Sequence, residues 1–267
     1  MMFHETHFKN RPQFGFTLVE LAIVLMIIGL LIGGILRGQE LVTNARVNST
    51  IQQVKAYEGA TVTFHDSYQS LPGDMATALN RLPGCLTGNT NFCVNGNGDG
   101  IVGITTAGAA TMQLSNTVAQ RETIMFWKHL ALTHLISGIT PNANPASPEW
   151  GRTHPAAKLR GGYNVMHIPG NGTISGANTS SGLFLRLQTG LTGSAFSSTS
   201  GCTVSPCNST EAVTPREAWT IDNKMDDGRP EGGSVYADDQ GGGLSGCEIN
   251  YTPTVEGAIC IMFFRLI

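Results

Sequence analysis

Charged side chains are scarce in this chain. They make up 13% of its 267 residues, whereas about 25% is usual in soluble proteins. The 16 Lys and Arg nearly balance the 19 Asp and Glu, so the formal net charge is −3. This balance gives no electrostatic reason to expect a nucleic-acid partner, and it argues against DNA or RNA binding as the main activity. Because 33 residues are glycine, we expect Gly, Ser, Thr and Asn to cover much of the surface.

Common catalytic signatures are also missing. The chain contains no P-loop, no H-E-x-x-H zinc motif and no G-x-S-x-G nucleophile elbow. Residues 98–103 match G-x-G-x-x-G, but the flanking residues lack the strand and helix that a dinucleotide site needs. The sequence therefore predicts a non-enzymatic protein that requires no cofactor.

Residues 21–36 contain no polar side chain at all. Extended back to Phe16, this apolar run is interrupted only by Thr17 and Glu20, and as a helix it would be about 30 Å long, the thickness of a bilayer core. No A-x-A-like cleavage site follows it, since the next residue is Arg37 and then come Gly, Gln and Glu. The run thus predicts a retained transmembrane helix rather than a removed signal peptide.

Glu20 is the unusual residue within this apolar helix. A carboxylate in hydrocarbon costs on the order of 2.5–3.5 kcal/mol, and such residues usually have a partner and a function. Cleavage between Gly15 and Phe16 would create a free amine that supplies this partner when subunits pack their apolar helices together. We therefore expect Glu20 to act in assembly rather than in simple anchoring.

The segment GFTLVELAIVLMIIGLLIGGIL resembles the prepilin signature shared by type IV pilins and type II secretion pseudopilins. The resemblance implies that a prepilin peptidase cuts after Gly15 and that the new N-terminal residue, Phe16, is N-methylated. It also implies that Glu20 pairs with that amine on a neighbouring subunit. The chain departs from many pilins by having Gly33 and Gly34 where a helix-bending proline is common.

The resemblance also implies a division of the chain. Residues 1–15 would be the leader, residues 16–70 a helical stem, and residues 71–267 a globular head. Within the stem, residues 16–36 would cross the membrane and residues 37–70 would form an amphipathic helix.

The same resemblance implies a structural role. The chain would be a subunit of a type IV pilus-like filament, with itself or other pilins, the prepilin peptidase/methyltransferase and an inner-membrane assembly platform as partners. A type II secretion pseudopilin and an adhesive or ligand-binding minor pilin are the alternatives. The implied location is the bacterial inner membrane, as a single-pass precursor with a periplasmic head, and then a filament in the periplasm or on the cell surface.

The pattern beyond the membrane segment predicts an α+β fold, with a long N-terminal helix and a head that contains a helix and a small antiparallel sheet. Residues 115–137 predict the head helix, which would stop before Gly138. Short strands are predicted at residues 163–168, 182–187, 217–221, 233–237 and 258–266. Apolar residues recurring every three or four positions predict the inner stripe of the outer stem, and they are Val47, Ile51, Val54, Tyr57, Thr61, Phe64 and Tyr68.

All six cysteines lie in the predicted head. Six cysteines allow 15 pairings, and the sequence alone does not choose among them. The simplest hypothesis pairs neighbours along the chain. A zinc site is the alternative, but no C-x-x-C spacing is present and a head outside the cytoplasm favours disulfides. The three local pairs are Cys85 with Cys93, Cys202 with Cys207, and Cys247 with Cys260.

Two loops are candidate calcium sites. Asn95, Asn97 and Asp99 occupy alternate positions before a glycine, as at the start of an EF-hand loop, but Thr106 stands where a bidentate Glu belongs. A flexible Asn-Gly turn is the alternative interpretation of this segment.

The second candidate is the acidic cluster Asp222, Asp226 and Asp227, with Gly228 for the turn. Some pseudopilins hold calcium in a loop late in the head, so the resemblance makes a calcium role here worth testing. Neutralisation of the cluster by Lys224 is the alternative.

Overall fold

A computed structural model describes most of the head and stem. The described residues are 17–86, 92–103, 118–144, 149–168, 173–174, 177–178, 181–190, 212–238, 247, 250–254, 257 and 260–267. The chain divides into two compact units, Met1–Ala45 and Arg46–Ile267, and each is described by itself.

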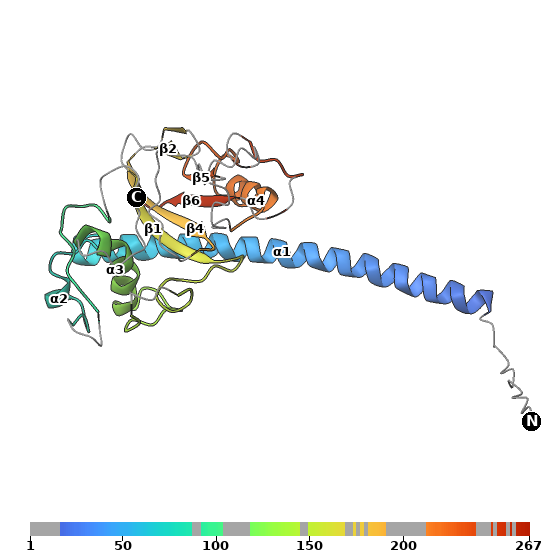
Figure 1. The fold of residues 1–267 in the computed structure, drawn as a ribbon, viewed down its shortest axis with the longest axis horizontal. Helices are drawn as coiled ribbons and strands as arrows, with labels where there is room; N and C mark the ends of the chain where they lie inside the picture. The colour runs from blue at the N-terminus through green and yellow to red at the C-terminus, as the bar shows by residue number, and fades with distance from the viewer. Residues whose placement is uncertain are drawn as a thin grey trace, which may run out of the picture. The chain divides into compact units, whose positions relative to one another are not determined.

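Helix α1 (Leu18–Tyr68) forms the predicted stem (Figure 1). It ends at Gln69, which adopts a φ of 55° while its N–H still donates to the carbonyl of His65. The residue after the helix is thus in the left-handed region, which stops α1 close to residue 70, the predicted end of the stem. From residue 47 onward, the predicted stripe is buried except for Tyr68, which is half-buried. The amphipathic interpretation of the outer stem is confirmed.

An aromatic contact joins α1 to the rest of the head. The ring of Tyr57 meets Trp127 of helix α3 (Val118–Leu132) edge-on at 5.2 Å, and it meets Tyr163 of strand β1 (Gly162–Ile168) at 5.3 Å. All three side chains are buried. Edge-to-face pairs of this kind stabilise by about 0.5–1.5 kcal/mol beyond the burial of their area, so this cluster fixes the helix face against both elements.

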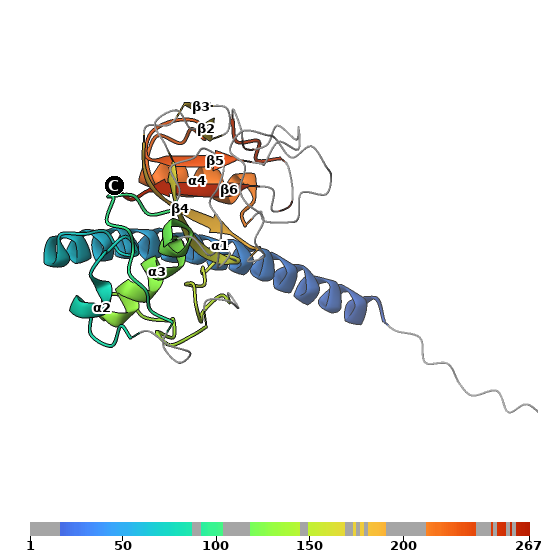
Figure 2. The same ribbon diagram turned by 60° about the vertical axis from the view of Figure 1, so that its left-hand side comes forward.

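The sheet is four-stranded and antiparallel throughout, with the order β1-β4-β6-β5 (Figure 2). Alternate residues of β1 serve two cores: Tyr163 and Val165 join the core that includes α1, while Met166 and Ile168 join a smaller cluster on the other face. The predicted α+β fold is confirmed. The remaining strands are β2 (Thr173–Ile174), β3 (Ala177–Asn178), β4 (Gly182–Gln188), β5 (Val235–Asp238) and β6 (Ile261–Arg265).

The strand predicted at residues 217–221 is wrong, because these residues belong to helix α4 (Pro215–Met225). Thr214 caps this helix: its hydroxyl oxygen accepts the N–H of Glu217, and the Glu217 carboxylate accepts the N–H of Thr214 at 2.9 Å. Pro215 stands at the first helical position, where its ring already fixes the φ angle near the helical value. This capping box was visible in the sequence as T-P-R-E, and it outweighs the strand-like residues that follow.

Helix α3 ends at Leu132, five residues before the predicted end. His134 adopts a φ of 57° and donates its N–H to Ala131, while Leu135 donates to Leu130 at 3.0 Å. This is the double hydrogen-bond pattern of a Schellman C-cap. The prediction placed the end of the helix before Gly138, because glycine is the usual left-handed residue at a helix end. In the structure the left-handed residue is His134. The predicted start, residues 115–117, lies outside the described residues.

A short helix and two disulfides complete the described head. Helix α2 spans Ala78–Arg81. Cys85 pairs with Cys93 and Cys247 pairs with Cys260, with Cα separations of 5.2 and 5.8 Å. These are two of the three local pairs that the sequence predicted. The third, Cys202 with Cys207, lies outside the described residues.

The α4 cap can be tested by the change Thr214→Ala. We expect it to lower the free energy of unfolding by about 1 kcal/mol, the usual effect of removing a threonine N-cap. Thermal unfolding of the purified chain in detergent micelles measures this loss. Thr220→Ala is the matched control, because the Thr220 hydroxyl is exposed and donates to the Arg216 carbonyl within α4 rather than capping the helix. An equal loss in both variants would show that the cap has no special role.

Candidate functional site

The N-terminal part of α1 presents apolar side chains that are exposed among the residues the structure describes. Leu18 is 90% exposed and Leu30 is 79% exposed, and the apolar residues between them are also exposed. By length and composition, this helix is sufficient to cross a membrane. Exposed apolar surface on this scale is unfavourable in water, so its natural surroundings are hydrocarbon or other apolar helices.

Glu20 lies in the first turn of this helix and forms a second capping box. The N–H and the hydroxyl of Thr17 both donate to the Glu20 carboxylate at 2.9 Å, and the N–H of Glu20 donates to the Thr17 hydroxyl oxygen at 3.2 Å. The helix N-terminus favours a negative charge at this position. The T-x-x-E pattern at residues 17–20 signals this local role, which the sequence-based prediction missed. Gly15 and Phe16 lie outside the described residues.

The start of this helix and the residues before it match a known family model. Residues 10–36 match the family model described as the prokaryotic N-terminal methylation motif. This is a prepilin-type N-terminus. The matched range includes Gly15, Phe16 and Glu20, so these three residues lie within the segment that is similar to this motif. The motif is structural rather than enzymatic, and its apolar helix is consistent with anchoring in the inner membrane. Comparison with curated proteins and with solved structures finds no match.

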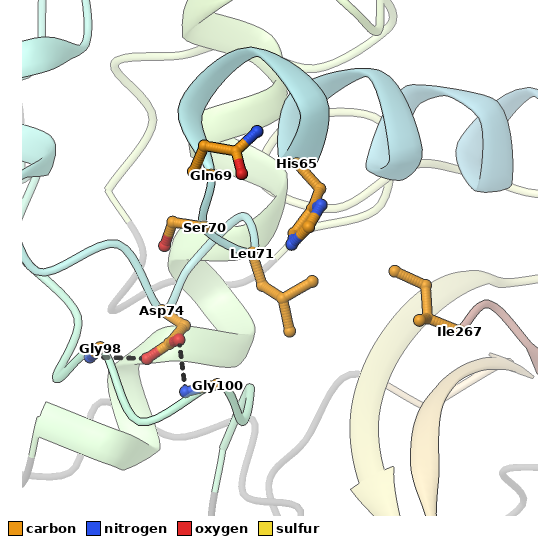
Figure 3. A pocket seen from close by; sticks show the side chains of 8 residues that line it. All are labelled: His65, Gln69, Ser70, Leu71, Asp74, Gly98, Gly100 and Ile267. Atoms are coloured by element: carbon orange, nitrogen blue, oxygen red, sulfur yellow. Dashed lines mark hydrogen bonds between the residues drawn. The ribbon is translucent and has the colours of Figure 1, made fainter.

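The head of this prepilin-type chain contains a glycine-rich turn, residues 95–103, which we call the glycine loop. The buried carboxylate of Asp74 accepts three backbone N–H groups from it: Gly98 at 2.7 Å, Asp99 at 3.1 Å and Gly100 at 2.9 Å (Figure 3). Gly98 and Gly100 have φ values of 76° and 83°, which only glycine adopts without strain. Successive N–H groups in such a turn form a concavity for an anion, and Asp74 occupies it.

A second buried carboxylate holds the same loop from the other side. Glu122 of α3 accepts the N–H of Asn97 at 2.9 Å and that of Gly103 at 3.1 Å. Burial, with a smaller contribution from the carboxylates of Asp74 and Asp99, raises the pKa of Glu122 to about 7 despite the lowering effect of these hydrogen bonds. Burial raises the pKa of Asp74 as well. Neither residue was selected from the sequence, because each lies far along the chain from the loop.

The predicted calcium ligands of the glycine loop have protein partners. Asn95 accepts the N–H of Leu79 through its side-chain oxygen at 2.9 Å, and the Asn97 amide donates to Asp99 at 2.7 Å. Ligand atoms of Asp99, Asp74 and Glu122 lie within 4.8 Å of one another. The structure thus brings Asp99 together with two other acids rather than with Asn95. Calcium binding by the loop remains a prediction.

The second acidic cluster is assembled at the end of α4. Carboxylate oxygens of Asp222, Asp226 and Asp227 lie within 4.8 Å of one another. Asp222 is fully buried and accepts the hydroxyl of Tyr251 at 2.7 Å, and burial raises its pKa to about 6. Lys224 does not neutralise the cluster, because its ammonium group donates to Asn48 of α1 at 2.7 Å.

Backbone groups also approach this cluster. Asp226 accepts the N–H groups of Ser234 and Val235, and Asp227 accepts that of Arg229 at 2.9 Å. The set offers only hard oxygen ligands, which suits Ca²⁺ rather than a softer metal. Like charges contribute to the raised pKa of Asp222, so a bound cation would offset a repulsion already present.

The raised pKa of Glu122 makes the stability of the head depend on pH. Its folded-state pKa of about 7 exceeds the ordinary value of 4.5, so folding favours the protonated form. The stability from this group is therefore fully present below pH 4.5 and is lost as the pH rises through about 7. A Glu122→Gln variant lacks this titration. We expect the thermal midpoint of the variant, relative to the wild type, to rise as the pH is raised from 4.5 to 7.

This comparison isolates one residue. His129 and His154, whose pKa values burial lowers to about 4, titrate in both proteins and cancel in the difference. Glu58→Gln, at an exposed position on α1, is the matched control for the charge change. A midpoint difference for Glu122→Gln that stays constant over this pH range would contradict the assignment.

Proposed function

We propose that the chain is a structural subunit of a type IV pilus-like filament. The observation that carries this proposal is a single helix that combines the N-terminal methylation motif, an uncovered apolar surface and one carboxylate in its first turn. The precursor inserts through this helix with its head in the periplasm. The prepilin peptidase/methyltransferase cuts after Gly15 and then methylates the amine of Phe16. An inner-membrane platform then draws the subunit into a filament.

The capping box suggests how Glu20 changes partner during assembly. In the single chain, the carboxylate accepts hydrogen bonds from Thr17 of its own helix. In a filament, the amine of Phe16 on a neighbouring subunit offers a full positive charge in an apolar bundle. A charge pair is far more favourable there than either charge alone. This change of hydrogen-bond partner would set the register between subunits. Before assembly, Thr17 would donate the hydrogen bonds that the Glu20 carboxylate needs in the membrane.

Two alternatives belong to the same class of protein. A type II secretion pseudopilin would use the same helix and the same processing. An adhesive or ligand-binding minor pilin would differ in the function of its head. The gene neighbourhood separates a pilus subunit from a secretion pseudopilin. A retraction ATPase gene would indicate a pilus, and genes for a secretin and a secretion ATPase would indicate a secretion system.

The role of Glu20 is testable by the change Glu20→Ala. We expect normal membrane insertion, because the apolar helix is unchanged. Filament yield should fall at least about tenfold, because breaking a buried charge pair costs about 3–5 kcal/mol. Membrane fractionation and quantification of sheared filaments measure the two effects. Glu40→Ala removes an exposed acid farther along the same helix and should leave both unchanged. Filaments at wild-type level from Glu20→Ala would refute the pairing role.

We also propose that calcium stabilises the head at Asp222, Asp226 and Asp227. Their converging oxygens support the proposal, as does the engagement of Lys224 elsewhere. The ion would hold the end of α4 to the turn that leads into β5. Its role would be structural.

Thermal unfolding of the full chain in calcium chloride and then in chelator tests this site. We expect a higher midpoint with calcium, and we expect Asp227→Asn to abolish most of the difference. Asp66→Asn, at an exposed position on α1, should retain it. An identical midpoint with and without calcium for the wild-type chain would exclude a stabilising ion.

A further inference from the structure

A cavity of about 350 Å³ lies where α1 ends. Four separate parts of the head surround it: the last turn of α1 with His65, the following turn with Leu71 and Asp74, the glycine loop, and Ile267 after strand β6 (Figure 3). Its volume falls at the lower end of the range of about 300–1,000 Å³ for small-molecule sites. None of its lining residues belongs to the cluster of Asp222, Asp226 and Asp227, whereas Asp74, Gly98 and Gly100 also make the glycine-loop contacts described above.

The walls of this cavity are held by hydrogen bonds. Gly98 and Gly100 are bound to Asp74, as described above. Ile267 is tied to β4, since its carbonyl accepts the N–H of Leu183 at 3.2 Å. The side chain of Gln69 donates to the Asp66 carbonyl at 3.0 Å and closes the helix end. A site with fixed walls loses little ordering entropy on binding.

The charge of the lining selects against ionic ligands. Among the described residues that line the cavity, none is Lys or Arg, so an anion would find no counter-charge. The N–H groups of Gly98 and Gly100 are already used by Asp74. That carboxylate accepts three donors, which reduces its capacity to hold a cation.

The remaining groups suit a neutral ligand with many hydroxyls. His65, Gln69 and Ser70 both donate and accept hydrogen bonds, and Leu71 and Ile267 provide an aliphatic wall. Gly100 has open space where a Cβ would stand, with no atom within 4 Å, so a ring can approach its backbone. Hydroxyls on the edge of a sugar ring and C–H groups on its face match this combination.

We propose that this cavity binds one ring of a neutral saccharide, with its hydroxyls toward His65, Ser70 and Asp74 and a C–H face against Leu71 and Ile267. The ligand is either a free sugar or the end of a surface glycan, which present the same chemistry. This inference goes beyond the filament role and does not depend on it, because binding is measured on the unassembled chain.

The test uses the full chain in a detergent without a sugar headgroup. Saturation-transfer NMR on the probe's own protons follows titrations with glucose, galactose and N-acetylglucosamine. Putrescine, an organic dication, is followed in the same way, and inorganic phosphate is followed by ³¹P line broadening. We expect saturable transfer to at least one neutral sugar and none to the charged probes. Tighter binding of an oligosaccharide than of its terminal sugar identifies a glycan as the source, and equal binding identifies the free sugar.

Variants locate the site. His65→Ala and Ser70→Ala should each weaken sugar binding about tenfold, the effect of losing one good hydrogen bond to a bound ligand. Ser67→Ala is the matched control, since the Ser67 hydroxyl is exposed and donates to the Thr63 carbonyl at 2.8 Å. Binding of phosphate or putrescine instead of sugar, no binding of any sugar, or undiminished sugar binding in both cavity variants would each overturn the proposal.

Discussion

The burial of one stripe of α1 is the constraint on which the head depends. From Val47 to Phe64 the stripe forms one side of the main core, and its centre is Tyr57, whose ring contacts both Trp127 and Tyr163. Without this helix face, α3 and the inner face of the sheet would have no common partner. The same helix carries the methylation motif at its other end. One element therefore supplies both the core of the head and the apolar segment for the membrane.

The few charged residues of the head have structural uses. Asp74 and Glu122 each bind backbone N–H groups of the glycine loop, and Asp222 and Asp226 do the same at the end of α4. Burying a carboxylate is unfavourable unless hydrogen bonds replace its water. The raised pKa values of Glu122 and Asp222 show that this replacement is incomplete. Loops that lack regular structure are thus held at an energetic cost that depends on pH.

The two ends of the chain differ in how their function is encoded. The N-terminal methylation motif consists of contiguous residues, so a family model recognises it within residues 10–36. Any ligand of the head would be recognised by residues that are far apart in sequence, as at the cavity where His65, Asp74 and Ile267 meet. The saccharide site and the filament role are therefore separate properties of one chain, linked only by the helix that both use.

The sequence by itself determined what depends on local pattern. The apolar run and Glu20 indicated the prepilin-type helix, the three-four spacing identified its buried stripe, and proximity along the chain predicted the disulfides at Cys85 and Cys247. Strand 217–221 and the end of α3 were predicted wrongly, because the cap at Thr214 and the left-handed His134 outweighed residue preference. Only the tertiary structure brought Asp74 and Glu122 onto the glycine loop and enclosed the cavity. Their partners are separated by long stretches of chain, and no spacing rule relates residues that meet only through packing.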